Sequence, residues 1–320
     1  MKIGPDGAIR GEVRAPGNQR VAHGLYRLET PHLTPWANFL RDLSALLLVL
    51  PPGAVYTHVT AARLLGWQVP VLPEQVPHFA AVRGDCRPRR PGLICSRLTH
   101  QARPRIVHGL PVDEPAEILL RAARDFGDLD LAVMVDSAAH LGHVDEAAVK
   151  KVLASKRPGT RRLRRVWKSR SSLAESAGET LLRKFHDAMD VPTEAQVYIH
   201  DESGRFVCRA DLVVVGTLNI HEYDGGVHRE PSVHRRDLRR ERALASTAYV
   251  RRGYTLDDLL NHAATLMHEL DRVLDRPHQA ERLRRWRALV DDSLYSETGR
   301  ARVMNRWYRS TTPVDWAGTA

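Results

Sequence analysis

The stretch that decides the fold is RADLVVVGTLNIHEYDG, residues 209–225. β-Branched residues on both sides of Gly216-Thr217 predict two strands, 205–215 and 218–224, joined by a hairpin. Glycine in the first position of a two-residue loop is typical of a type II′ turn. A loop made of these two residues would place Asp211 directly across from Glu222.

Asp211, Glu222 and Asp224 are therefore expected on one face of the sheet. Opposed like charges are destabilising unless something neutralises them, so removing either of the facing acids should relieve repulsion in the metal-free protein. Mg²⁺ or Mn²⁺ suits such carboxylates and can assist the cleavage of a phosphate ester. The alternative is that one carboxylate is a turn residue beside Gly225-Gly226 and another pairs with an arginine.

The elements around this hairpin predict a mixed sheet with helices packed on it. Periodicity and breakers favour a helix over 173–189 and a strand over 197–200 before it, then a helix over 234–246, a strand over 248–254 and a helix over 256–274 after it. An Arg-rich amphipathic stretch, 281–290, and a tail follow. The fold class is α/β, with a C-terminal mixed sheet flanked by helices.

The N-terminal half predicts a separate α+β unit. Residues 1–34 are rich in glycine, proline and turn residues and are expected to be irregular, with one short strand at 23–28. Helices are expected over 36–50, 57–65, 115–126, 129–139 and 144–153, and a small sheet from the apolar runs 76–82, 93–98 and 106–112. The predicted divisions are 1–150, a basic linker 151–174, a second domain 175–275 and an extension 276–320.

Residues 151–174 contain no acidic residue. As a linker or a short basic helix, this segment would lie beside bound DNA. Each phosphate that it neutralises would add about 0.9 to the slope of log affinity against log salt concentration. The alternative is a solvated helix face. The predicted DNA contacts are Arg161, Arg162, Arg164, Arg165 and Lys168.

Composition points to the same partner class. The formal charge is +10 and the pI is about 9.9, mainly from arginine, whose planar fork suits phosphate. The excess could equally reflect a GC-rich genome. The expected partner is DNA, with no membrane partner and no small-molecule cofactor, and the sequence leaves a homodimer open.

Cysteine usage and hydropathy predict a soluble, cytoplasmic protein. Cys86, Cys95 and Cys208 form no CxxC motif, so neither a disulfide framework nor a zinc finger is indicated. The apolar run 43–50 is far shorter than the roughly 20 residues that span a bilayer, and the first residues lack the apolar segment of a signal peptide.

Several ordered motifs across residues 171–275 resemble a bacterial family related to very-short-patch-repair endonucleases, within the PD-(D/E)XK nuclease superfamily. The motifs are Ser176-Ala-Gly-Glu179 with Arg183, Asp211, EYDGGVH at 222–228, DLRRERAL at 237–244 and YVRRGY at 249–254.

The resemblance implies a metal-dependent DNA endonuclease of defence or repair. Asp211 and Glu222 would bind Mg²⁺ or Mn²⁺, Glu179 would hold the site through water, and His228 would assist the attack or protonate the leaving group. Asp224 stands where the superfamily has a lysine that orients water. The sequence therefore leaves open an inactive DNA-binding or antitoxin-like regulator with the nuclease fold, in which His228 is a surface residue.

The first unit resembles the region that follows the winged helix in abortive-infection antitoxins of the AbiEi type. The residues that carry this resemblance are HGLY at 23–26, HVTAARLLG at 58–66 and GLPVDEPAE at 109–117. No complete helix–turn–helix pattern precedes His23, so DNA reading by this module does not follow from the resemblance. The alternative is that these residues are core and caps of a scaffold domain.

Overall fold

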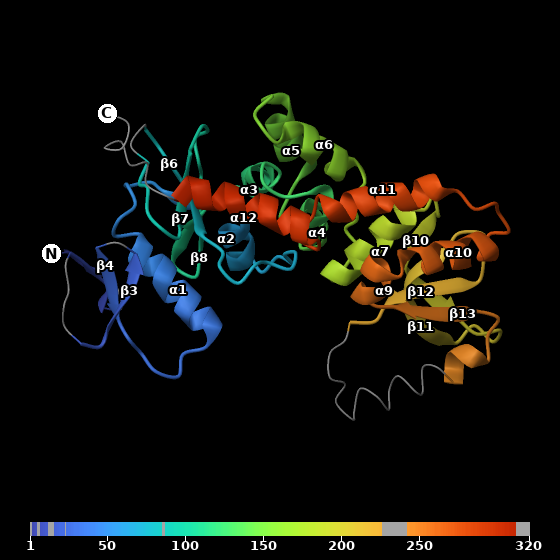
Figure 1. Cartoon of the computed structure of the whole chain (residues 1–320). Helices are drawn as coiled ribbons and strands as arrows, with labels where there is room; N and C mark the ends of the chain where they lie inside the picture. Colours follow the sequence, from blue (N-terminus) through green and yellow to red (C-terminus); the bar gives the residue numbers. More distant parts are fainter. Residues whose placement is uncertain are drawn as a thin grey trace. The chain divides into compact units, whose positions relative to one another are not determined.

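The computed structural model describes residues 2–4, 7–11, 16–22, 24–84, 87–225 and 242–311. It contains helices and mixed sheets, which confirms the α/β class (Figure 1). The chain forms two compact units that are both discontinuous in sequence. Unit 1 comprises Met1–Asp125, Glu146–Leu163 and Arg300–Ala320, and unit 2 comprises Phe126–Asp145 and Arg164–Gly299.

These units differ from the linear divisions expected from sequence. The segment Phe126–Asp145, which carries α4 (Asp128–His140), belongs to unit 2, and the C-terminal residues from Arg300 belong to unit 1. In unit 2, α4 packs against α7 (Ala177–Ala188). Hydrophobic periodicity predicts which face of a helix is buried but not which element covers that face. The sequence therefore could not predict that α4 belongs to unit 2 and the residues from Arg300 to unit 1.

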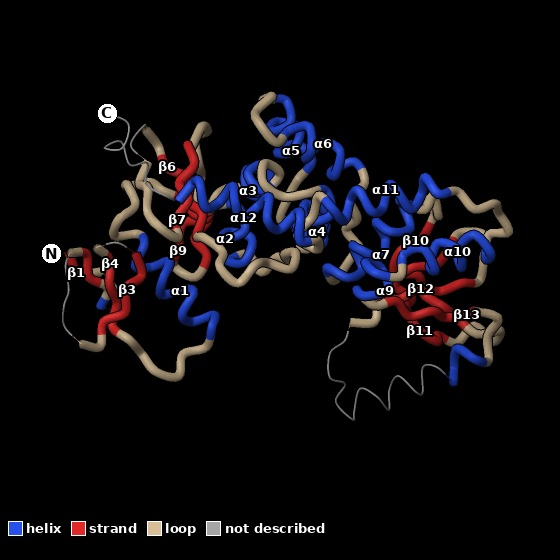
Figure 2. Tube along the Cα trace, viewed as in Figure 1, coloured by secondary structure: helices blue, strands red, loops and turns tan. Residues whose placement is uncertain are grey.

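Unit 2 is built on a four-stranded sheet of β10 (Thr193–His200), β11 (Phe206–Val214), β12 (Asn219–Tyr223) and β13 (Val250–Tyr254), in that order. β10, β11 and β12 are antiparallel, whereas β13 runs parallel to β12. Figure 2 shows these strands in red. This is the predicted mixed sheet. A parallel neighbour requires a crossover connection rather than a tight hairpin turn.

Helices cover one face of this sheet. Leu182 and Phe185 of α7 pack with Leu212 and Val214 of β11, and Trp286 of α11 (Ala280–Asp291) completes this core. The predicted helix 256–274 is two helices, α9 (Leu256–Asn261) and α10 (Ala263–Val273), because His262 between them has non-helical backbone angles.

Unit 1 begins with a small sheet that the sequence did not predict. β1 (Lys2–Ile3), β2 (Ile9–Arg10), β4 (Leu25–Leu28) and β3 (Asn18–Ala22) lie in that order, and α1 (Pro35–Leu46) packs on β3 and β4. The expected short strand at 23–28 is present as β4, but the expectation that the rest of the segment is irregular is wrong. Strands of two to five residues among many turn residues give almost no period-two signal, and backbone pairing alone reveals them.

The second sheet of unit 1 confirms the expected small sheet. Its order is β7 (Leu93–Arg97), β6 (His78–Val82), β5 (Val55–Tyr56), β9 (Leu110–Val112) and β8 (Arg105–Val107). The helices of this unit include α2 (His58–Leu64), α3 (Pro115–Ala122), α5 (Glu146–Ala154) and the end of α12 (Glu297–Thr311).

The basic segment is helical rather than extended. α6 (Thr160–Lys168) buries Leu163, Val166 and Trp167, which selects the short basic helix over the linker. None of the helices within the described ranges is long and apolar enough to cross a membrane.

Candidate functional site

β11 and β12 pair in the predicted register. Val213 lies opposite Ile220, and the same register continued by two residues sets Asp211 across from Glu222. The turn type differs from the prediction. The amide of Thr217 donates to the carbonyl of Val214 at 3.1 Å, and Gly216 has a φ of 76°. A positive φ at the third turn position indicates type II, not type II′. The register is the predicted one because the observed loop, residues 215–218, is centred on the same Gly216-Thr217 pair as the predicted two-residue loop.

Asp211 is anchored to the neighbouring strand. Its Oδ2 accepts a hydrogen bond from the backbone amide of Tyr223 at 3.1 Å. The amide belongs to the residue directly after Glu222, so this bond ties the two predicted metal ligands together through the backbone.

An arginine neutralises the acids that were expected to repel. Arg251 of β13 places Nε 2.5 Å from Oε2 of Glu222 and Nη2 3.1 Å from Oδ1 of Asp224. Glu222 is only 3% exposed, so its charge needs such a partner. The expectation of unrelieved repulsion is wrong for Glu222, and the alternative in which a carboxylate pairs with an arginine holds for Glu222 and Asp224. The sequence did not single out Arg251, because this residue comes close to Glu222 only when β13 pairs in parallel with β12.

Gly253 makes room for Asp224. It lies opposite Glu222 in the β12–β13 register, and a Cβ at this position would lie 1.8 Å from Oδ2 of Asp224. The Asp224 carboxylate therefore fills the space that a side chain at position 253 would take. The absence of a side chain at 253 and the position of Arg251 together hold Asp224 against the strand.

Glu179 of α7 is linked to the strand beside Asp211 by a hydrogen bond from one side chain, that of Gln196. Gln196 lies opposite Asp211 in the β10–β11 register and has a φ of 57°, and its Nε2 donates to Oε2 of Glu179 at 3.1 Å. The same carboxylate oxygen accepts the amide of Glu175 at 2.9 Å. Glu179 is thus linked to the predicted site, and Gln196 is a further residue of the site that the sequence did not single out.

The start of α7 is pressed against β12. A Cβ on Gly178 would lie 2.1 Å from the ring of Tyr223, a contact that no real side chain tolerates. Ser176 accepts the amide of Glu179 at 3.1 Å and so caps the helix at this point. The glycine therefore allows α7 to approach closely enough for Glu179 to reach Gln196.

The opposite face of β12 carries a buried histidine pair. Nε2 of His186 lies 2.7 Å from Nδ1 of His221, and Nδ1 of His186 donates to the carbonyl of Leu182 at 2.8 Å. Burial lowers the pKa of His186 to about 4, and burial with the charge of His186 lowers the pKa of His221 to about 2. Both rings are neutral at physiological pH, so this pair is structural and lies apart from the acids.

The carboxylates fit a hard divalent cation by donor type, but the described residues do not preform a complete site. No group of three or more His, Cys, Asp or Glu side chains in the described part of the chain is placed to hold a metal ion. Because Arg251 takes Oε2 of Glu222, a cation shared with Asp211 would require this guanidinium to move. His228 and most of the motif at 237–244 lie outside the described residues.

The predicted DNA contacts lie on α6. Arg161, Arg164, Arg165 and Lys168 are exposed and recur at helical spacing, whereas Arg162 is half-buried. Arg165 binds both carboxylate oxygens of Asp128, one of them at 2.6 Å, and this hydrogen bonding raises its pKa. The other exposed residues form a basic face of suitable spacing for phosphates.

Comparison with family models, curated proteins and solved structures finds no match to this chain. The site therefore has to be interpreted from its own geometry. It offers two facing acids, a third acid held by an arginine, and a helix acid linked through an amide side chain. Carboxylates grouped in this way can bind a divalent cation, and the arginine can contact an anion such as phosphate.

Proposed function

We propose that unit 2 hydrolyses phosphodiester bonds of DNA with Mg²⁺ or Mn²⁺ held by Asp211 and Glu222. The observation that carries the proposal is the β11–β12 register, which sets these two acids across from each other. A helix, three antiparallel strands and a fourth, parallel strand follow one another in the chain, and this mixed sheet with a helix against it supports the proposal.

The chain's own residues have distinct roles in this proposal. Asp211 is fixed by the amide of Tyr223, and Glu179 is positioned through Gln196. Arg251 pairs with Glu222 and Asp224, and it would be free to contact the substrate phosphate if its contact with Glu222 were released. When bound, the cation supplies charge neutralisation and an activated water. His228 handles a proton, as the resemblance implies.

A second candidate is a non-catalytic DNA-binding or antitoxin-like regulator that retains the nuclease fold. The observation that favours it is the Arg251 guanidinium, which already satisfies Glu222 and Asp224 without a metal. Asp224 also occupies the position at which the superfamily has its lysine. In this case the basic face of α6 would bind DNA phosphates and the acids would be structural.

Plasmid nicking and thermal melts, each with Mg²⁺, Mn²⁺ or EDTA, separate the two candidates. A nuclease should nick supercoiled DNA only with metal and lose this in Asp211→Asn. Its Tm should rise with Mn²⁺, since a ligand at one hundred times Kd stabilises the folded state by about 2.7 kcal/mol. Asp257→Asn, an exposed acid on α9, is the matched control. Binding of DNA with neither nicking nor a Mn²⁺ shift would reject the nuclease and support the regulator.

A further inference from the structure

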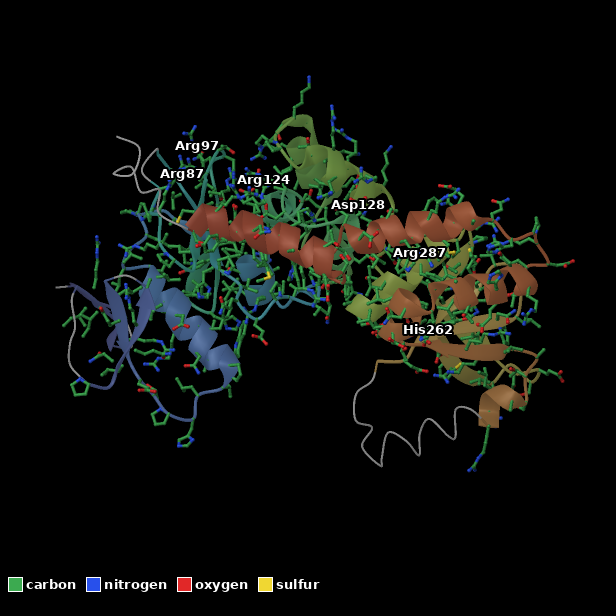
Figure 3. The ribbon with its side chains drawn as sticks, viewed as in Figure 1. Arg87, Arg97, Arg124, Asp128, His262 and Arg287 are labelled. Atoms are coloured by element: carbon green, nitrogen blue, oxygen red, sulfur yellow. The ribbon has the colours of Figure 1, made fainter. Side chains whose placement is uncertain are left out.

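Unit 1 contains a cavity of about 590 Å³ whose wall is dominated by arginine. Eight arginines line it, with Asp125 as the one acidic residue among the described lining residues. The side chains of Arg87, Arg97 and Arg124 lie along the same side of unit 1 (Figure 3). No sequence motif indicated this cluster, because its members come from the β6–β7 loop, β7, α3 and its C-terminal end, the segment before α6, and α12.

Protein carboxylates balance only part of this charge. Arg306 pairs with Asp125 at 2.6 Å, and Arg157 pairs with Glu117 at 2.6 Å. Arg87, Arg124 and Arg309 form no ion pair with any carboxylate in the described part of the chain. These three guanidinium groups therefore gather at one cavity without a directly paired carboxylate among the described residues.

Arg121 adds a donor at the inner wall. Its side chain is 7% exposed, its Nε donates to Asp113 at 3.3 Å, and its Nη1 donates to the hydroxyl of Ser96 at 2.9 Å. Its Nη2 is buried and finds no hydrogen-bond partner within the described residues. A buried, unsatisfied donor is costly, and Arg121 is among the residues that line the cavity, so an acceptor on a bound ligand would lower this cost.

The arginines also repel one another. Desolvation lowers the pKa of Arg124, and the positive charges of Arg306, Arg121 and Arg157 lower it further, although Asp125 acts in the opposite direction. An anion in the cavity would remove this repulsion. Phosphate groups match the planar fork of arginine better than any other common biological anion of high charge.

The shape favours a small ligand over a duplex. Cavities of roughly 300–1,000 Å³ are typical of small-molecule sites. Phe79, Ile94 and Leu120 give this cavity an apolar wall as well. A DNA backbone instead needs a basic stripe along which successive phosphates can lie, whereas these arginines gather around one pocket that has apolar side chains in its wall.

We propose that this cavity binds a small molecule with two or more phosphate groups, of the nucleoside di- or triphosphate class. The phosphates contact Arg87, Arg124, Arg309 and Nη2 of Arg121, and the apolar wall of Phe79 and Ile94 receives the base. The proposal departs from the expectation that no small-molecule cofactor is bound. It concerns unit 1 alone and is independent of the nuclease proposed for unit 2.

Calorimetric titration of the full chain with ATP and with sodium tripolyphosphate, both in EDTA, tests the proposal. We expect both to bind, ATP more tightly, and adenosine not to bind at millimolar concentration. Arg124→Gln/Arg309→Gln should weaken ATP binding roughly tenfold or more, since it removes charged hydrogen-bond donors. Arg287→Gln is the control, because it removes an exposed arginine of α11 in unit 2.

Three results would overturn the proposal. The first is no heat of binding with either ATP or tripolyphosphate. The second is equal ATP affinity for the double variant and for Arg287→Gln, both with the parent's circular dichroism. The third is that the double variant loses binding to duplex DNA while ATP does not bind the parent, which would make the cluster a nucleic-acid surface. Arg121 is left intact in these variants because its bond to buried Asp113 supports the fold.

Discussion

Nε of Arg251 lies 2.5 Å from Oε2 of Glu222, although the two residues are separated by 29 positions in the chain. The parallel pairing of β12 and β13 brings them together, with Arg251 opposite Ile220 and Gly253 opposite Glu222. Glu222 is nearly inaccessible to water, and the arginine compensates its charge in the metal-free protein. This pair decides how the acidic site responds to mutation.

Breaking the pair from one side should destabilise the protein. Glu222→Gln and Arg251→Met should each lower the free energy of unfolding by roughly 3 kcal/mol, the lower end for a buried pair. The Arg251 side chain is 24% exposed, and this exposure limits the loss. Urea unfolding of both single variants and the double variant measures the coupling. We expect the double variant to be clearly more stable than the sum of the two losses predicts, and strict additivity would mean that the ion pair contributes nothing.

The histidine pair should make stability fall in mild acid. Each histidine titrates near 6.5 in the unfolded chain, whereas burial lowers the folded-state pKa of His186 to about 4 and of His221 to about 2. Below about pH 6.5 the unfolded chain therefore binds more protons than the folded protein, so stability present at neutral pH is lost as pH falls. The slope from this pair is up to about 1.4 kcal/mol per pH unit for each histidine.

Denaturant unfolding between pH 7.5 and 4.5 measures this slope. His221→Gln should remove about half of the contribution from the pair, whatever its effect on stability at pH 7.5. His268→Gln, at an exposed position on α10, is the matched control and should leave the slope as in the parent. Equal slopes for the parent and His221→Gln would show that the pair does not govern acid sensitivity.

Gly178→Ala should destabilise the protein despite the better helix propensity of alanine. Propensity favours alanine by about 1 kcal/mol inside a helix, while overpacking costs roughly 1–3 kcal/mol. The new methyl group would lie 2.1 Å from the Tyr223 ring, so the packing cost prevails. In a Tyr223→Ala background the same substitution should become neutral or stabilising. Thermal melts of the four proteins decide, and a higher Tm for Gly178→Ala in the parent would refute the close approach of α7 to β12.

If DNA binds to α6, the salt dependence of the affinity should come mainly from three residues of this helix. Arg161→Gln/Arg164→Gln/Lys168→Gln should lower the slope of log affinity against log salt by about 0.9 for each phosphate that the protein no longer neutralises. Arg165→Gln is the matched comparison and should lower the slope less, because Asp128 already binds this guanidinium through two oxygens. Filter binding or anisotropy at several salt concentrations measures the slopes. Parent-like behaviour of the triple variant would place the DNA surface elsewhere.

The sequence by itself determined the local elements of unit 2 and the pairing of its acids. Apolar and β-branched residues define β11 and β12, and a loop centred on Gly216-Thr217 fixes their register whichever turn type forms. Asp211 opposite Glu222 follows from this local information. The α/β class and the helical nature of most long periodic segments follow in the same way, because side-chain periodicity is a local property.

Only the tertiary structure decided what surrounds these acids. The neutralising Arg251 and the open position at Gly253 come from a parallel strand reached by a long crossover, and the arginines of the cavity come from several separate parts of unit 1. The exchange of α4 and the C-terminal residues between the units is also decided at this level. Periodicity shows which face of an element is apolar, but the choice of partner depends on burying all such faces at once, and this is a property of the whole chain.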